Sequence, residues 1–453
     1  MADNVTGETL TTVAWALKYD YLPDLISQVP ERVPLLHCFM QTPIKGSDGG
    51  PVPPNTPVIR QLPKSHYTGG ISATFFARMS DEEGVNSPGE NEILPWPSTG
   101  DGQKGEITCK KIAGKIAFTN EALVHAASTK FAAFANLMDD KMETMISAIA
   151  RDMNRQLNGD GGAAITTLSA NVTDAASMTF TVADVSKLTR GMLLDVVSVS
   201  GTTYTRKTST TLAVKVGAID AANLQFVGTK YGTDTTGTIF GGAEGSGWYL
   251  YRWGSAGSLS GNAFAYREIN GVDGLVGTGA CGHATNCLAI SPTDYPEWQS
   301  TVDNNSSVLR DFDETILQEL YDDVCHYGDP NLWLTTPAQR RAYVAQLQTQ
   351  VRYAPRMLLG GFEVLSWAGG GREIPILIDR QATANQWSLL DTKKLFLALI
   401  GDFEWEPGSI KDILHSTMVG TTGKHGYEAL IFKYWNLGTF KRRAHGKANY
   451  INN

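Results

Sequence analysis

The stretch KFAAFANLMDDKMETMISAIARDMNRQL, residues 130–157, decides the fold of this chain. Its large apolar residues recur every three or four positions, which is the period of an amphipathic α-helix. These residues are Phe131, Phe134, Met138, Met142, Met145, Ile149, Met153 and Leu157. The charged residues that mark the other side are Asp139, Asp140, Glu143, Arg151, Asp152 and Arg155. The helix is expected to stop at Asn158-Gly159 and, at ~1.5 Å per residue, to brace a whole subunit with its Met/Phe face buried.

The segment before the helix, residues 61–118, has two strand-like flanks around an acidic middle. We expect strands at 58–62 and 71–76 on the way out, and at 106–110 and 115–118 on the way back. Glycines and prolines interrupt the middle, which has no Lys or Arg between positions 81 and 102. Its acids are Asp81, Glu82, Glu83, Glu90 and Glu92. This pattern predicts a long hairpin with a negatively charged tip that lies on another surface, since an isolated hairpin is marginal in water; a solvated surface loop is the alternative.

Residues 1–60 are predicted to form an extended arm and not a core element. One short helical stretch is expected at 17–29. Beyond it, Pro43, Pro51, Pro53, Pro54 and Pro57 fix φ and remove backbone donors, which favours extended backbone. A chain that opens with an exposed arm and an exposed hairpin is built to be covered by neighbouring chains, and a domain linker is the alternative for the arm.

The chain changes character after the helix. Residues 160–254 are rich in Thr, Ser, Gly, Val and Ala. Apolar and polar residues alternate within 178–182, 193–199, 212–216 and 224–227, which predicts short strands in a small inserted β-barrel or sandwich. Residues 255–400 alternate strands and helices, with a strand at 287–291, a helix begun by Pro292 and another begun by Thr336 and Pro337. Residues 401–453 end in a strand at 427–435 and a basic cluster. That cluster contains Lys441, Arg442, Arg443 and Lys447.

Composition excludes several classes of protein. Of the 453 residues, 42% are hydrophobic and 19% charged, which is typical of a folded chain. A formal net charge of −8 argues against a dedicated nucleic-acid binder, although a local basic patch is still compatible with DNA contact. Neither a secretory signal nor a membrane-spanning apolar run is present in the sequence. The cysteines, five in number, fit a reducing cytosol, with their thiols free.

Short motifs with catalytic or ligand-binding potential are weak. Residues 277–282, GTGACG, match GxGxxG, but no βαβ unit frames them, so a flexible loop is expected. Cys281, His283 and Cys287 lack a fourth zinc ligand. Asp322 and Cys325 fall with His326 on one predicted helix and are interpreted as a helix face. We therefore predict no catalytic residue, no cofactor and no metal site.

The order of these segments resembles the major capsid proteins of tailed bacteriophages with the Hong Kong 97-type fold. The arm, the acidic hairpin and the long spine helix follow each other in the order of that family. Residues 114–124, GKIAFTNEALV, resemble its lead into the first peripheral-domain helix, here expected near 119–127. Residues 372–379, REIPILID, and 388–395, SLLDTKKL, resemble its axial-to-peripheral return, and 436–451 resemble its closing strand. The resemblance implies an α+β fold with arm, extended loop, a peripheral spine helix at 119–159, an inserted β domain, an axial α/β domain and peripheral return strands at 401–453.

The function that the resemblance implies is structural. Copies would form pentamers and hexamers of an icosahedral shell around phage DNA. Scaffold, portal and decoration proteins would be the partners, and no membrane would be involved. The shell would assemble in the host cytoplasm and the protein would then be part of the virion. No long helical pro-segment precedes the arm, which favours a separate scaffold. The acidic tip and the basic cluster are the candidate subunit-interface residues, with DNA or bulk solvent as alternatives for the cluster. The alternative functions are an encapsulin-like nanocompartment shell, or a carbohydrate-binding or hydrolytic β protein.

Overall fold

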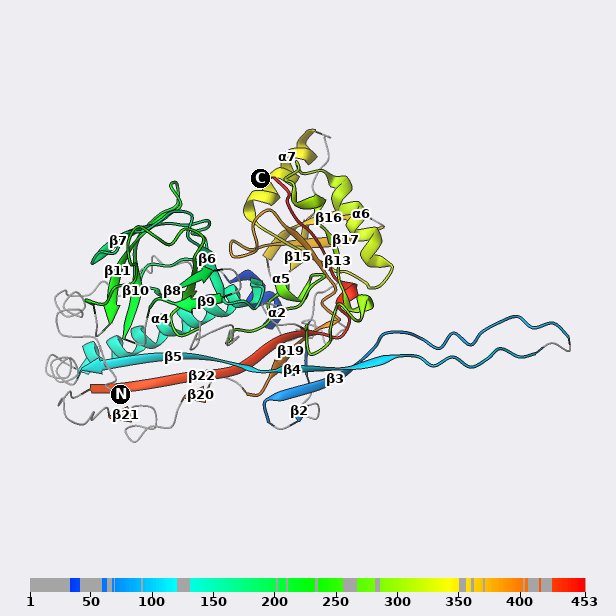
Figure 1. Cartoon of the computed structure of the whole chain (residues 1–453), viewed down its shortest axis with the longest axis horizontal. Helices are drawn as coiled ribbons and strands as arrows, with labels where there is room; N and C mark the ends of the chain where they lie inside the picture. The colour runs from blue at the N-terminus through cyan, green and yellow to red at the C-terminus, as the bar shows by residue number, and fades with distance from the viewer. Residues whose placement is uncertain are drawn as a thin grey trace.

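The computed structural model describes residues 33–40, 59–62, 67–68, 70–90, 93–119, 131–200, 203–208, 211–232, 235–255, 267–281, 286–349, 356–359, 362–369, 371–401, 404–405, 415–416 and 426–452. Figure 1 shows an α+β body from which one long hairpin projects. A long helix lies on a narrow sheet, a β unit covers the helix from the other side, and an α/β unit stands beside them. The expected helix at 17–29 and the proline run at 43–57 lie outside the described residues.

Helix α4 (Phe131–Asn158) confirms the central prediction from the sequence. In its second half, Met145, Ile149, Met153 and Leu157 are all buried in the main hydrophobic cluster. The helix lies on strand β5 (Lys110–Thr119), and Gly114 of that strand is needed for the close approach, because a Cβ there would lie 2.7 Å from Cδ1 of Ile149.

The narrow sheet below α4 combines segments from both ends of the chain. Strand β22 (Gly426–Thr439) pairs antiparallel with β5 along its length, from Gly426 opposite Thr119 to Trp435 opposite Lys110. The sheet order is β1-β19-β22-β20, with β5 and β21 also on β22. The remaining strands are β1 (Arg60–Gln61), β19 (Leu395–Leu399), β20 (Glu404–Trp405) and β21 (His415–Ser416).

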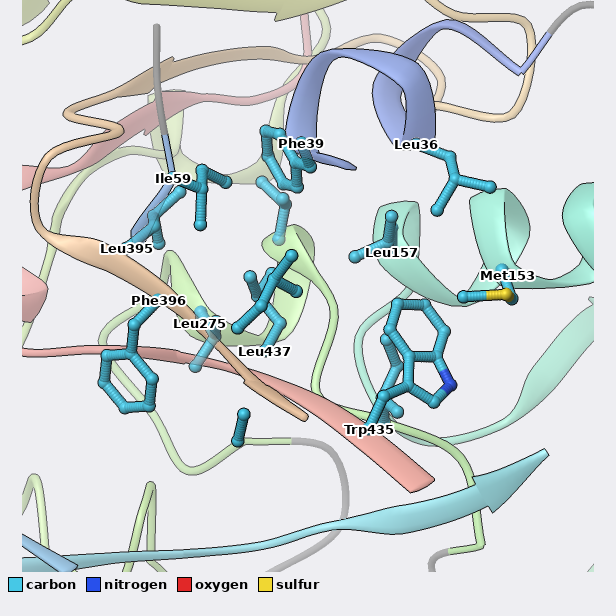
Figure 2. Close-up of a cluster of buried hydrophobic side chains, with 14 of the residues drawn as sticks. Leu36, Phe39, Ile59, Met153, Leu157, Leu275, Leu395, Phe396, Trp435 and Leu437 are labelled. Carbon is cyan, nitrogen blue, oxygen red and sulfur yellow. The ribbon is translucent and has the colours of Figure 1, made fainter. Parts of the chain in front are cut away.

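Part of the predicted arm belongs to the core, which corrects that prediction. Helix α2 (Pro34–Met40) buries Leu35, Leu36, Cys38 and Phe39 against the main cluster. The backbone N–H of Leu36 donates to Oδ1 of Asn154 at 3.0 Å, which ties this helix to α4. Figure 2 shows Leu36 and Phe39 above the end of α4 and the β19–β22 pair. The prediction for the arm rested on the prolines at 43–57, which lie outside the described residues, and it assigned no element to 34–40, where Pro34 begins a helix at a position whose missing N–H costs nothing.

The polar side of α4 is also buried at its C-terminal end. Arg155 donates to Asp152 at 3.0 Å and to Glu268 at 2.6 Å, and Arg252 reaches Asp152 at 2.9 Å. Arg252 belongs to the β unit, so this ion network joins that unit to α4. The amphipathic pattern identified these positions as polar but could not identify the partners that cover them.

Residues 164–252 form a closed β-barrel. The 7-stranded sheet has the order β6-β12-β8-β10-β11-β7, with β9 paired to β8. The bridge between Leu168 and Val182 joins its two ends. Phe180 and Phe226 stack in the interior with ring centroids 4.7 Å apart. The strands are β6 (Ala164–Thr167), β7 (Ser177–Thr181), β8 (Leu193–Ser200), β9 (Thr203–Arg206), β10 (Leu212–Asp220), β11 (Gln225–Gly232) and β12 (Tyr249–Arg252).

The α/β unit is a second 7-stranded sheet, ordered β13-β23-β18-β14-β17-β16-β15. Trp333, Trp367 and Trp387 fill its core against helices α6 (Glu314–Cys325) and α7 (Pro337–Thr349). Helix α7 confirms the helix start predicted at Thr336 and Pro337. The strands are β13 (Thr301–Asp303), β14 (Leu332–Thr335), β15 (Arg356–Leu359), β16 (Phe362–Gly369), β17 (Arg372–Ile378), β18 (Trp387–Leu390) and β23 (Gly446–Ala448).

Two predictions for the second half of the chain were wrong. Residues 287–291 form a tight turn bridged between Cys287 and Ile290, and only the 3-10 turn η2 (Pro296–Trp298) follows Pro292. The C-terminal end does not stay with the return strands, because β23 inserts between β13 and β18 of the α/β sheet. The short elements η3 (Asn305–Ser307), η4 (Arg442–Ala444) and α5 (Val272–Leu275) lie in connections.

Candidate assembly surfaces

The predicted hairpin exists and has a buried root. Strand β3 (Ser72–Arg78) pairs antiparallel with β4 (Gly102–Thr108) in register from Ser72 opposite Thr108 to Arg78 opposite Gly102, and β2 (Tyr67–Thr68) pairs on the outer edge of β3. Ala73, Phe75 and Ala77 face the main cluster because alternate residues of a strand share one side. The root is therefore fixed to the body of the subunit.

Beyond Arg78 the hairpin leaves the body as two extended segments that stay side by side (Figure 1). The N–H of Met79 donates to the carbonyl of Asp101 at 2.9 Å, and the N–H of Asp101 donates to Oγ of Ser80 at 2.8 Å. Further out, Oγ of Ser98 accepts from the N–H of Glu83. These bonds hold the two segments together without a regular ladder.

The acidic candidates lie on this projection. Asp81, Glu82, Glu83 and Glu90 are exposed, whereas Glu92 lies outside the described residues. Asp81 is paired with Arg78 at 3.3 Å, but both side chains are nearly three-quarters exposed, so this pair stabilises little. The structure places these acids along the projection, from Asp81 near its base to Glu90 near its end, and nothing in the described part of the same subunit covers them.

The sequence reasoning missed an apolar component of the same projection. Val85, Ile93, Leu94 and Trp96 are exposed, and Trp96 is 85% exposed. The signal was present as the run ILPW at 93–96, within a stretch that was interpreted by its acids alone. Exposed large apolar side chains that gather on one surface mark a contact site.

The basic C-terminal candidates do not form one surface, which corrects the predicted cluster. Arg442 is completely buried, and its guanidinium donates to the carbonyls of Leu275 at 2.7 Å and Gly274 at 3.3 Å. Lys447 is paired with Asp273 at 2.7 Å within the subunit. Arg443 stacks on the ring of Tyr327 at 3.8 Å, and Lys441 is exposed. Only Lys441 and Arg443 are placed to reach another molecule.

The weak chemical motifs have structural roles. Cys281 and Cys287 are joined in a disulfide, so the expected free thiols at these positions are wrong, and His283 lies outside the described residues. Asp322 and Cys325 are exposed on α6, and His326 caps its end. Among the described residues, no group of His, Cys, Asp and Glu has the arrangement to hold a metal ion. No helix in the described part of the chain is long and apolar enough to span a membrane.

Comparison with known proteins identifies the fold. No protein-family model and no curated protein matches the sequence. The structure superimposes on the capsid of cyanophage A-1(L) over 98% of this chain and 100% of that chain, with a TM-score of 0.52 and 11% identity. A structure from Mycobacterium phage Bobi gives a TM-score of 0.43 at 8% identity over 98% and 99% of the two chains. The SrpI encapsulin of Synechococcus elongatus PCC 7942 gives 0.39 at 9% identity over 87% and 85%. The agreement with the cyanophage A-1(L) capsid shows that the chain has the fold of a phage capsid subunit, as the order of its segments predicts.

Proposed function

We propose that this chain is the major capsid protein of a tailed bacteriophage, which assembles into the icosahedral head shell that encloses the phage DNA. One observation carries the proposal: the fold agrees with the cyanophage A-1(L) capsid over essentially the whole length of both chains. The role is structural, and assembly proceeds by burial of surface between copies in pentamers and hexamers.

The projecting hairpin supports assembly between copies. A tip with Trp96, Leu94 and Ile93 exposed is unfavourable in water until a partner covers it. Exposed acids beside these apolar residues select a partner surface that is apolar and basic, because charge complementarity fixes the register and discourages wrong pairings.

The outer face of the β5–β22 ribbon is a surface of that kind. Lys111 and Lys115 are exposed on β5, on the side away from Ile112 and Ile116, which face α4. Lys111 lies over the ring of Phe432 at 4.7 Å, and Lys115 pairs with Glu428 at 2.6 Å. We infer that the hairpin of one copy lies on this face of the next copy.

The finer assignments follow from the same proposal. The barrel at 164–252 is an insertion in the capsid fold and lies at the outer surface of the shell. Scaffold, portal and decoration proteins are the further partners, the DNA lies on the inner face, and the mature protein is located in the virion.

Electron microscopy of the purified protein tests the proposal. Expression with its neighbouring phage genes should yield large, closed, DNA-filled shells. Small shells without DNA would identify a nanocompartment of the encapsulin type instead. A protein that forms no particles under any assembly condition, and that binds or hydrolyses carbohydrate, would overturn the proposal in favour of a β-barrel binding protein or enzyme.

A further inference from the structure

A cleft of about 430 Å³ opens where the chain leaves α4 and meets α5 and the C-terminal segment. Residues 277–280 of the GTGACG motif form one wall, and Arg442 and Lys447 contribute to the other. The motif has no role in the assembly surfaces described above.

Arg442 is a buried cation without a counter-ion. Its Nε and Nη2 donate to backbone carbonyls, but Nη1 has no hydrogen-bond partner. No carboxylate of the described residues pairs with it, and burial lowers its pKa to about 10. Since burial of an uncompensated charge is costly, this side chain is the kind of group that a bound anion stabilises.

The glycine loop beside Arg442 offers further donors. Within the described residues, the backbone N–H groups of Gly277, Thr278, Gly279 and Ala280 donate no hydrogen bond. Successive unpaired N–H groups in a glycine-rich turn are typical of anion-binding loops. Thr278 and Gly279 are exposed, so their side chains do not anchor the loop against the outward shift that a ligand of the buried guanidinium requires.

The carboxylates of the lining do not supply the missing charge. Asp273 is occupied by Lys447 at 2.7 Å, and it also accepts from Gln386 and Thr383 at 3.2 Å. Oδ1 of Asp160 accepts from the N–H of Gly162 at 2.7 Å. The lining also contains one buried acceptor without a partner, Oδ1 of Asn449, whereas the unpaired groups of Arg442 and residues 277–280 are donors.

We propose that this cleft binds a small oxyanion of the phosphate class, held by Nη1 of Arg442 and the N–H groups of residues 277–280. The guanidinium has no exposed surface, and this favours a free oxyanion over the backbone of duplex DNA, which cannot follow the loop inward. The proposal does not rest on shell assembly and is tested on the unassembled subunit.

The experiment is a thermal-unfolding titration of the purified subunit with inorganic phosphate, against sodium chloride at equal ionic strength. Phosphate should raise the unfolding midpoint in a saturable way, because a ligand that binds only the folded state stabilises it. Isothermal titration calorimetry on the unmodified protein should give a matching affinity. An equal response to chloride, or no heat of binding, would overturn the proposal. A stronger response to short duplex DNA than to phosphate would reject the free oxyanion as the ligand.

The substitution Gly277→Asp places a carboxylate in the cleft, since a Cβ at this position meets only Nη2 of Arg442, at 3.4 Å. We expect this variant to lose the phosphate response. Gly277→Asn adds the same volume without the charge, so the difference between the two variants reports the carboxylate. Lys441→Gln removes an exposed charge outside the lining and should leave the response unchanged. If Gly277→Asp responds to phosphate as the unmodified protein does, the site is not where we place it.

Discussion

Arg155 of α4 donates a hydrogen bond to the carboxylate of Glu268 at 2.6 Å, and only 5% of each side chain is exposed. The same guanidinium also holds Asp152, whose carboxylate Arg252 of the barrel approaches from the other side. Burial favours the neutral form of Asp152, but Arg155 and Arg252 outweigh burial and keep its pKa below the ordinary value. Burial dominates at Glu268 and raises its pKa. Arg155 therefore compensates two buried acids at once.

Replacement of Arg155 by Met should be strongly destabilising. It leaves Asp152 and Glu268 buried with too little positive charge, and the loss of one partner from a buried pair costs about 3–5 kcal/mol. Denaturant unfolding of the subunit measures the loss. Arg151→Met is the matched control, because Arg151 is half-buried and has no carboxylate partner among the described residues, and its cost should be about 0.5 kcal/mol or less. Equal losses in the two variants would contradict a special role for Arg155.

Met145→Asp should prevent soluble folding. Met145 is buried between α4 and β5, and a carboxylate there has no partner, at a cost of several kcal/mol. The adjacent Ile146 is 53% exposed, so Ile146→Asp is the control and should give soluble, folded protein. Soluble yield and circular dichroism distinguish the two. A soluble and assembling Met145→Asp variant would show that this face of α4 is not part of the core.

Local periodicity was sufficient to predict α4, the hairpin and the main strands of the barrel, because each depends on residues that are neighbours in sequence. It did not predict the surroundings of polar residues. Arg155 meets Glu268 more than a hundred positions away, and Arg442 meets Gly274 and Leu275 at a similar separation. The basic residues at the C-terminal end are neighbours in sequence and were therefore predicted to form one surface, although tertiary contacts bury Arg442.

The same distinction explains the errors at the ends of the chain. Helix α2 is short and is stabilised by Asn154 and the main cluster, neither of which its own sequence shows. Strand β23 joins the α/β sheet through β13 and β18, whereas the prediction followed sequence order and kept it with β22. The apolar tip of the hairpin was missed for another reason: its residues have no strand or helix period, and only their exposure in the structure identifies them.

The subunit should lose stability as the pH falls below about 6.5. Burial, reinforced by the positive charge of Arg442, lowers the pKa of His445 to about 3 from an ordinary value of 6.5. Its Nδ1 accepts the backbone N–H of Asp391 at 3.2 Å, which excludes a proton there. The unfolded chain therefore binds one more proton between these values. The stabilisation is complete above pH 6.5 and is lost toward pH 3, at up to ~1.4 kcal/mol per pH unit.

His445→Gln should flatten this dependence, because the amide does not titrate. Unfolding free energies measured from pH 7 to pH 4 provide the slope, and the difference between variant and unmodified protein removes the contribution of the carboxylates. Exposed His326, replaced in the same way, is the control and should leave the slope as it is. An unchanged slope in His445→Gln would mean that His445 does not control acid stability.

The barrel should be removable without loss of the remaining fold. The chain enters it after Gly159, at the end of α4, and returns beside the same helix, since Arg252 at the end of β12 pairs with Asp152 of α4 at 2.9 Å. A short Gly/Ser linker in place of residues 160–254 can therefore connect the ends. The shortened subunit should be soluble with an intact α/β sheet by circular dichroism, although shells made from it should be less stable. Insolubility under every condition tried would make the barrel part of the core.

The projecting hairpin should contribute to assembly through both its exposed acids and its exposed apolar residues. The dependence of assembly on salt concentration distinguishes these two contributions. In the first variant, Asn replaces Asp81 and Gln replaces Glu82, Glu83, Glu90 and Glu92. Electrostatic attraction between exposed groups is screened by salt, so this variant should assemble in lower yield and with less dependence on salt concentration.

In the second variant, Ser replaces Leu94 and Trp96. This change removes apolar contact area, so yield should fall while the salt dependence remains. The subunit itself should fold normally in both variants, because all these side chains except the undescribed Glu92 are exposed. Asp322→Asn with Asp323→Asn, on the exposed side of α6, is the control for charge removal elsewhere. Light scattering across a salt series measures assembly. If both tip variants assemble as the unmodified protein does at every salt concentration, the hairpin does not hold the shell together, and its exposed tryptophan requires another partner.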